Sequence, residues 1–157
     1  MSVNVLISQP NLYDSKVFMP LVFLCLKTYT DLQADIEPVN WLDPLFRNTD
    51  VDTMLEGVDI ASLDVLGLSC YDWNWSLNMQ IAQRVRESNP GCLIVAGGPH
   101  PDWKDKNIFK KYPQLDAIVY NDGEKPFADI IRSVQNKTSI DNIPNLILPS
   151  CGSGVPS

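Results

Sequence analysis

The hydrophobic positions of the chain alternate between short continuous runs and longer stretches with helical spacing. Short apolar or β-branched runs predict five strands, at residues 3–8, 36–41, 65–70, 93–96 and 117–120. Between them the apolar residues recur every three or four positions, which predicts helices at residues 16–32, 50–56, 76–87, 105–112 and 124–134. Regular alternation of strands with helices is typical of an α/β protein with a parallel sheet. We therefore expect a doubly wound, flavodoxin-like or Rossmann-like sheet of five parallel strands in the order 2-1-3-4-5.

The periodicity ends after residue 134, and this change sets the expected domain boundary. The chain has 157 residues, of which 45% are hydrophobic, and both values are ordinary for one globular domain. We expect residues 1–135 to form that domain and residues 136–157 to form a linker or tail. Within the tail, residues 143–149 are expected to form a short extended segment at an edge.

Charge, hydropathy and cysteine spacing exclude several classes of partner. The formal net charge is −7, from 12 basic and 19 acidic residues, so nucleic acid is an unlikely partner. The longest apolar run, residues 17–26, contains Pro20 and is shorter than the ~20 residues that cross a membrane, so no membrane partner is expected. The four cysteines show no CxxC spacing, so we predict no metal site in the chain and a reducing, cytoplasmic location.

The unusual chemistry of the chain lies in the loops that follow the predicted strands. Ligands of open α/β sheets bind at the carboxyl ends of the strands, so these loops are the candidate site. The candidate residues are Ser8, Gln9 and Pro10 after the first strand, Tyr71, Asp72, Trp73, Asn74 and Trp75 after the third, Gly97, Gly98, Pro99 and His100 after the fourth, and Asn121, Asp122, Gly123 and Glu124 after the fifth.

Each of these loops has both a ligand-binding and a structural interpretation. Glycine at 97 and 98 lets the backbone approach a ligand closely, or it forms a tight turn with no ligand. Trp73 and Trp75 offer a flat apolar wall with N–H donors, although one of the two is expected to plug the sheet edge. Glu124 either holds ligand amides or hydroxyls or complements the dipole at a helix start.

Catalytic and nucleotide-binding motifs are not recognised in the sequence. His100, the only histidine, is more often a hydrogen-bonding loop residue than a metal ligand or base. No Ser/His/Asp or Cys/His triad can be assembled, and the sequence contains neither G-x-G-x-x-G nor a P-loop. We therefore predict no catalytic residue in this chain.

Three motifs resemble the cobalamin-binding N-terminal domain of class B, cobalamin-dependent, radical S-adenosylmethionine enzymes. One strand runs into residues 69–75, and another runs into residues 97–101. The third motif is the family's GEGE…F element, matched by Asp122, Gly123, Glu124 and Phe127. The resemblance covers residues 4–134. The chain departs from the family at Asn121 and Asp122, which replace the first Gly-Glu, and it lacks the catalytic barrel with its CxxxCxxC motif.

The resemblance implies a cobalamin lying across the carboxyl edge of the sheet. Its corrin would cover the loops at residues 71–75 and 97–100, and its nucleotide tail would run between the sheet and the helices. The loop at residues 9–15 lacks the histidine that related domains offer to cobalt, so we expect cobalt without a protein imidazole. Trp73 or Trp75 would shield the lower face. The candidate residues above, together with Phe127, would then bind the cofactor.

The resemblance also implies what this chain does not carry. S-adenosylmethionine and a 4Fe-4S cluster would belong to the radical S-adenosylmethionine barrel, joined in cis or acting in trans, and the parent enzyme would be a methyltransferase. The chain would then be a fragment or a stand-alone domain. Two alternatives remain open: a related domain without cobalamin that serves as a scaffold or substrate-recognition module, and a flavin-binding flavodoxin-like carrier. The lack of a Ser/Thr-rich loop after the first strand counts against the carrier.

Overall fold

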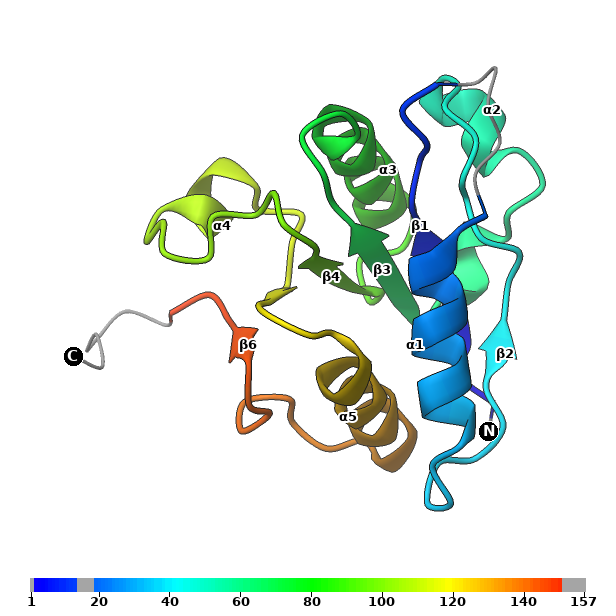
Figure 1. Ribbon diagram of the computed structural model, residues 1–157, viewed down its shortest axis with the longest axis vertical. Coiled ribbons are helices and arrows are strands. Elements are labelled where there is room, and N and C mark those ends of the chain that lie inside the picture. The colour runs from blue at the N-terminus through cyan, green and yellow to red at the C-terminus, as the bar shows by residue number, and fades with distance from the viewer. Residues whose placement is uncertain (1, 14–18, 151–157) are drawn as a thin grey trace.

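The protein is built around one twisted sheet, shown by a computed structural model that describes residues 2–13 and 19–150. The strands are β1 (Asn4–Ser8), β2 (Asn40–Trp41), β3 (Val65–Ser69), β4 (Leu93–Gly97), β5 (Ala117–Val119) and β6 (Leu146–Ile147). Their order is β2-β1-β3-β4-β5-β6 (Figure 1). The first five strands are parallel, in the predicted order. The predicted count of five strands was wrong, because β6 adds a sixth, antiparallel to β5, from within the segment expected to be extended.

Helices cover both faces of the sheet (Figure 1). They are α1 (Leu21–Asp31), α2 (Val51–Leu55), α3 (Trp75–Ser88), α4 (Ile108–Lys111) and α5 (Glu124–Asn136), with a short 3-10 helix at Ile60–Ser62. α1 and α5 lie against each other on one face, and α3 contacts α2 on the other. This two-sided arrangement confirms the predicted fold class.

Several predicted boundaries were too wide, and proline accounts for two of them. Pro20 takes the N-cap position of α1, so the helix begins at Leu21, while residues 16–18 lie outside the described part of the chain. β2 begins only at Asn40, after Pro38, whose ring nitrogen cannot donate to a neighbouring strand. The predicted helix at residues 105–112 is reduced to α4.

The central strands bury side chains on both faces, as their unbroken apolar runs predict. On β1, Leu6 points toward the α3 side, whereas Val5 and Ile7 point toward α1 and α5. On β3, Leu66 and Leu68 share the α3 side. Every second residue of each strand therefore faces α1 and α5.

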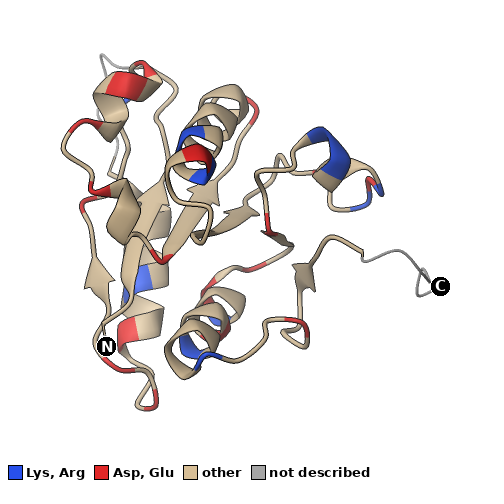
Figure 2. Ribbon diagram, turned by 180° about the vertical axis from the view of Figure 1, so that it is seen from behind, with Lys and Arg blue, Asp and Glu red and all other residues tan. Residues whose placement is uncertain are grey.

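The outer surface carries acidic and basic residues interspersed along the helices (Figure 2). Three arginines pair with carboxylates of distant segments: Arg84 with Asp52, Arg86 with Asp116 and Arg132 with Asp35. Within residues 2–13 and 19–150, no helix has both the length and the apolar character that crossing a membrane requires.

Candidate functional site

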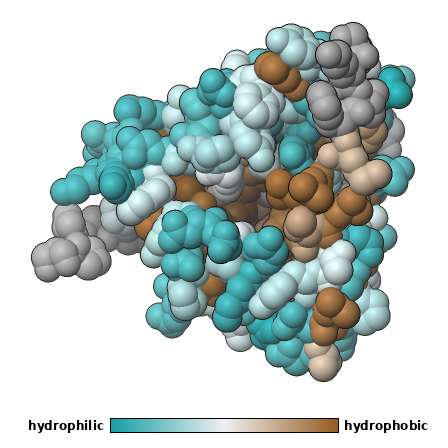
Figure 3. All heavy atoms as spheres, viewed as in Figure 1, coloured by the Kyte–Doolittle hydropathy of each residue, from teal (hydrophilic) through white to brown (hydrophobic). Residues whose placement is uncertain are grey.

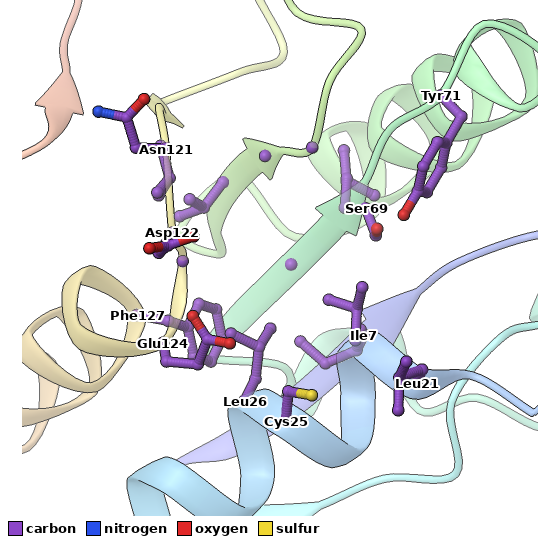
Figure 4. A pocket seen from close by; sticks show the side chains of 18 residues that line it. Ile7, Leu21, Cys25, Leu26, Ser69, Tyr71, Asn121, Asp122, Glu124 and Phe127 are labelled. Carbon is purple, nitrogen blue, oxygen red and sulfur yellow. The ribbon is translucent and has the colours of Figure 1, made fainter.

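A pocket opens at the carboxyl ends of β3, β4 and β5, on the face covered by α1 and α5. Its volume is about 280 Å³. The space-filling view shows it as a hollow with apolar side chains along the border where α1 lies (Figure 3). Side chains of the sheet, of both helices and of the β5–α5 loop point into it (Figure 4).

Strand register divides the pocket into two layers. Ile7 of β1 pairs with Gly67, which pairs with Val95, and these three residues form the deep layer. Ser69 pairs with Gly97, and a Cβ on Gly97 would lie 3.8 Å from the Val119 Cβ, so these three residues form the outer layer. The deep layer is wholly apolar, and the outer layer contributes one hydroxyl.

Glycine at position 67 lets two large side chains close the bottom of the pocket. A Cβ there would lie 2.6 Å from Ile7 Cδ1 and 3.2 Å from Phe127 Cε2, so both side chains rest on the bare strand. Phe127 is almost fully buried and stacks on Trp41 with ring centroids 6.2 Å apart. Leu26 of α1 completes the apolar lining at this depth.

The mouth of the pocket is polar and acidic. It consists of Tyr71 and of the loop that leads from β5 into α5, namely Asn121, Asp122, Gly123 and Glu124. Asn121 has a left-handed backbone, with φ of 64°, which turns the chain sharply after the strand. Among the described residues that line the pocket, none is Lys, Arg or His. The mouth therefore offers hydrogen-bond acceptors to ligand groups that donate hydrogen bonds.

The adjacent glycines at the end of β4 serve different purposes. Gly98 has φ of +94°, and a Cβ there would lie 2.5 Å from the Cys70 carbonyl oxygen and 2.9 Å from its nitrogen. The loop is held there because Cys70 N–H donates to Gly97 O at 2.9 Å and His100 N–H donates to Cys70 O at 3.2 Å. Gly98 thus permits a close approach within the chain itself, whereas Gly97 leaves space in the pocket.

The two tryptophans of the β3–α3 loop also separate. Trp73 is 45% exposed and stacks on Tyr71, with ring centroids 4.4 Å apart and planes 11° from parallel. Trp75 begins α3 and packs on the opposite face of the sheet, with its ring 4.9 Å from those of His100 and Tyr112. Tyr71 therefore forms the aromatic wall at the pocket mouth, and Trp73 stacks on it from outside the lining.

Buried amides hold this loop in place from below. Asn74 Nδ2 donates to the carbonyls of Ser69 and Pro10 at 3.0 and 3.1 Å, and its Oδ1 accepts from Tyr71 N–H at 2.8 Å. Ser8 Oγ donates to Asn78 Oδ1 at 2.8 Å, and Asn78 Nδ2 donates to the Ser69 carbonyl at 3.0 Å. This network fixes the end of β3 and the start of its loop against β1.

The buried Cys70 thiol beside this network is unreactive. Asn78 Nδ2 donates to Cys70 Sγ at 3.6 Å. Burial raises the pKa of the Cys70 thiol to about 12, so the group stays protonated and packs as a small apolar side chain.

The structure brings together only part of the predicted set. The predicted residues that line the pocket are Tyr71, Gly97, Gly98, Asn121, Asp122, Gly123, Glu124 and Phe127. The predicted residues outside it are Ser8, Gln9, Pro10, Asp72, Trp73, Asn74, Trp75, Pro99 and His100. Among these, Gln9 Oε1 accepts from Val22 N–H at 3.2 Å and so stabilises the first turn of α1.

The lining contributed by α1 was not predicted from the sequence. Leu21, Val22, Cys25 and Leu26 line the pocket, and their helical spacing looks like that of any helix packed on a core. The other lining residues that sequence reasoning missed are Ile7, Gly67, Leu68, Ser69, Val95 and Val119. Gly67, a glycine inside an otherwise apolar strand, was the one available signal of a close approach at this point.

A second groove adjoins the first across Gly98 and Asn121. It contains Pro99, His100 and Asp102, and it is bordered by Trp103 stacked on Tyr120 at 5.0 Å. The Lys104 ammonium also lies over the Trp103 ring, 5.0 Å from its centroid.

Comparisons with known proteins agree with this geometry. The chain is 37% identical over 115 residues to the cobalamin-dependent radical SAM methyltransferase TokK of Streptomyces tokunonensis, covering 73% of this chain and 17% of that protein. It is 36% identical over 115 residues to the 2-(S-pantetheinyl)-carbapenam-3-carboxylate methyltransferase of Streptantibioticus cattleyicolor, again covering 73% of this chain and 17% of that protein. The chain thus spans about a sixth of the length of these relatives.

A solved structure shares the fold. The radical S-adenosylmethionine methyltransferase TsrM of Kitasatospora setae, solved with cobalamin and a [4Fe-4S] cluster bound, superposes with a TM-score of 0.76 at 17% identity. The match covers 96% of this chain and 28% of that one. The family model of the B12 binding domain matches residues 31–131, and this confirms the predicted family and the predicted cofactor class. The chain therefore belongs to the B12 binding domain family.

Proposed function

We propose that this domain holds cobalamin with the nucleotide tail in the pocket and the corrin across the carboxyl edge of the sheet. The observation that carries the proposal is the pocket itself, because an apolar slot over Gly67 suits a flat aromatic base. The polar mouth then meets the ribose hydroxyl and the amide of the phosphodiester-containing chain that connects the base to the ring. When bound, cobalamin supplies a cobalt centre able to carry and transfer a methyl group.

Each side of the mouth has a distinct task in this proposal. The carboxylates of Asp122 and Glu124 accept hydrogen bonds from ligand hydroxyls or amides. The Tyr71–Trp73 stack supports one border of the ring from below and excludes water there. Ser8, Gln9, Pro10 and Asn74 act indirectly, by holding the loops and the start of α1.

The same geometry supports cobalt without a protein imidazole. His100 is engaged with the Trp75 ring on the other face of the sheet, and the described part of the β1–α1 loop contains no histidine. An indole N–H donates only and offers no lone pair to a metal. In this proposal Trp73 shields the lower face, because Trp75 packs against Tyr112 and His100.

A retention experiment tests cobalamin binding. The purified chain is mixed with hydroxocobalamin and desalted, and we expect corrin absorbance to remain with the protein. A folded chain that retains no corrin would favour the scaffold alternative, and a protein that purifies yellow would favour the flavin carrier.

Tryptophan variants test the assignment of the lower face. Trp73→Ala is expected to keep the unfolding midpoint and weaken retention of the corrin, whereas Trp75→Ala is expected to lower the midpoint because it removes ring contacts. Equal retention by Trp73→Ala and the unaltered chain would remove the role given to that ring. For the absent imidazole, the electron paramagnetic resonance spectrum of the bound cobalt(II) form should lack nitrogen splitting and should not change in His100→Ala.

The proposal extends to a partner domain. The relatives are several times longer than this chain, and a radical S-adenosylmethionine barrel in cis or in trans would act on the bound cobalamin in a cytoplasmic methyltransferase. Residues 136–157 would lead toward it. The reading frame after Ser157 tests the cis arrangement, since it should encode a CxxxCxxC motif. If it does not, the barrel acts in trans and should co-purify with the chain from its own cells.

A further inference from the structure

We infer that the deep layer of the pocket selects among cobamides by the polarity of their lower base, preferring an apolar benzimidazole to a purine. This inference rests on the proposed function, because it assigns a specificity to the pocket that holds the nucleotide tail. Natural cobamides share one corrin and differ in that base, so the choice is made in the pocket and not at the ring.

The bottom of the pocket offers a base nothing to hydrogen-bond. The side chains there are Ile7, Val95, Leu26 and Phe127, with Gly67 between them. Backbone groups are also committed, because β3 pairs with both β1 and β4, and β4 pairs with both β3 and β5. A base that reaches this depth leaves water without gaining a polar partner.

Polar groups of the pocket all lie nearer the surface. Ser69 belongs to the outer layer, two residues further along β3 than Gly67. On α5, Glu124 stands at the first position and Phe127 lies almost one turn deeper. The hydrogen-bonding capacity of the site is thus arranged for the ribose and its linker, and the far edge of the base meets hydrocarbon.

This arrangement treats the two kinds of base differently. The far edge of dimethylbenzimidazole carries two methyl groups, which contact an apolar wall without losing any hydrogen bond to water. The corresponding edge of adenine carries an amino group and ring nitrogens, which lose their water partners on entry. One or more unsatisfied groups of this kind weaken binding about tenfold or more.

Equilibrium dialysis of the full chain against three corrinoids tests the inference. The probes are cobalamin, the cobamide with adenine as its base, and cobinamide, which has no base. We expect cobalamin to bind at least about tenfold more tightly than the adenine form. Cobinamide should bind more weakly than cobalamin because it leaves the apolar bottom uncovered.

A pair of isosteric variants locates the selectivity. Val95→Thr adds a hydroxyl to the deep layer and should narrow the preference for cobalamin over the adenine form by about threefold or more. Val65→Thr makes the same change on the same face but outside the pocket, where it should leave the ratio unaltered. Thermal unfolding of both variants confirms that each is folded at the assay temperature.

The possible outcomes separate this inference from the proposed function. Equal affinity for cobalamin and the adenine form, or equal narrowing by Val65→Thr and Val95→Thr, overturns the selectivity and leaves cobalamin binding intact. Equal affinity for cobalamin and cobinamide also overturns it, because the base would then lie outside the pocket. Failure of all three corrinoids to bind the folded chain overturns the proposed function and the inference with it.

Discussion

Alanine substitution of the two neighbouring glycines at the end of β4 should lower stability at Gly98 and cofactor retention at Gly97. Gly98→Ala places a methyl group 2.5 Å from the Cys70 carbonyl oxygen, in a left-handed conformation that alanine resists. The conformation alone costs roughly 1–2 kcal/mol. Relieving the overlap requires the loop to move away from Cys70, and this weakens the bonds at 2.9 and 3.2 Å that hold it.

The expected loss of stability follows from adding these contributions. Each backbone hydrogen bond contributes roughly 0.5–1.5 kcal/mol, so Gly98→Ala should lower the free energy of unfolding by about 2–5 kcal/mol. Gly97→Ala meets nothing nearer than 3.8 Å and has no positive φ, so its stability should change by less than about 1 kcal/mol in either direction. Its methyl group would instead fill part of the outer layer and weaken retention of cobalamin.

Urea denaturation followed by circular dichroism measures both effects, and corrin retention after desalting measures the second. The reasoning fails if Gly98→Ala unfolds at the same urea concentration as the unaltered chain with an unchanged slope. It fails equally if Gly97→Ala loses as much stability as Gly98→Ala, because the close approach to Cys70 would then not distinguish the two positions.

Three further predictions follow from particular contacts. Arg86→Ala should lower the free energy of unfolding in urea by about 2 kcal/mol, because Arg86 donates to Asp116 and to the carbonyls of Pro90, Cys92 and Gln114. The control Arg84→Ala removes one exposed ion pair and should leave the urea midpoint unchanged. Equal midpoints for the two variants would contradict this prediction. In a Cys151→Ser background, saturating cobalamin should slow alkylation of the exposed Cys25 at the pocket, and an unchanged rate would place the ligand elsewhere. The pKa of Cys70 rises from 9.0 to about 12 on folding, so the free energy of unfolding should fall as pH rises above 9. In Cys70→Ala this free energy should fall by about 1.4 kcal/mol less per pH unit in that range. Parallel curves of unfolding free energy against pH for the two proteins would refute this prediction.

The strand order and the edge of the sheet at which the pocket opens could be predicted because they depend on local patterns. Apolar runs such as Val65 to Cys70 indicate strands buried on both faces, and right-handed crossovers leave few ways to arrange them. The edge strand β6 was harder to predict, since two residues with intermediate burial carry no periodic signal. Its position depends on pairing with β5, at Ile118 and Val119.

The roles of individual loop residues could not be predicted, because they depend on which face of the sheet each side chain reaches. Trp73 and Trp75 are two positions apart, yet α3 begins at Trp75, and the two rings pack against different partners. Gly97 and Gly98 look equivalent in the sequence, and only the approach of Cys70 separates them. Asn74 resembles a ligand contact until the four hydrogen bonds of its side chain within the chain are seen.

Hydrophobic periodicity and turn residues determined the α/β architecture and the edge at which the pocket opens. Both follow from the spacing of residues along the chain, which local sequence records directly. The family was indicated separately, by the resemblance of three loop motifs. The tertiary structure alone decided which residues form the pocket, because its lining joins Ile7, Leu26, Val95 and Phe127 from four separate elements. Such a surface is created by strand register and by the packing of α1 and α5 together, and contacts between distant segments leave no mark in the spacing of either segment.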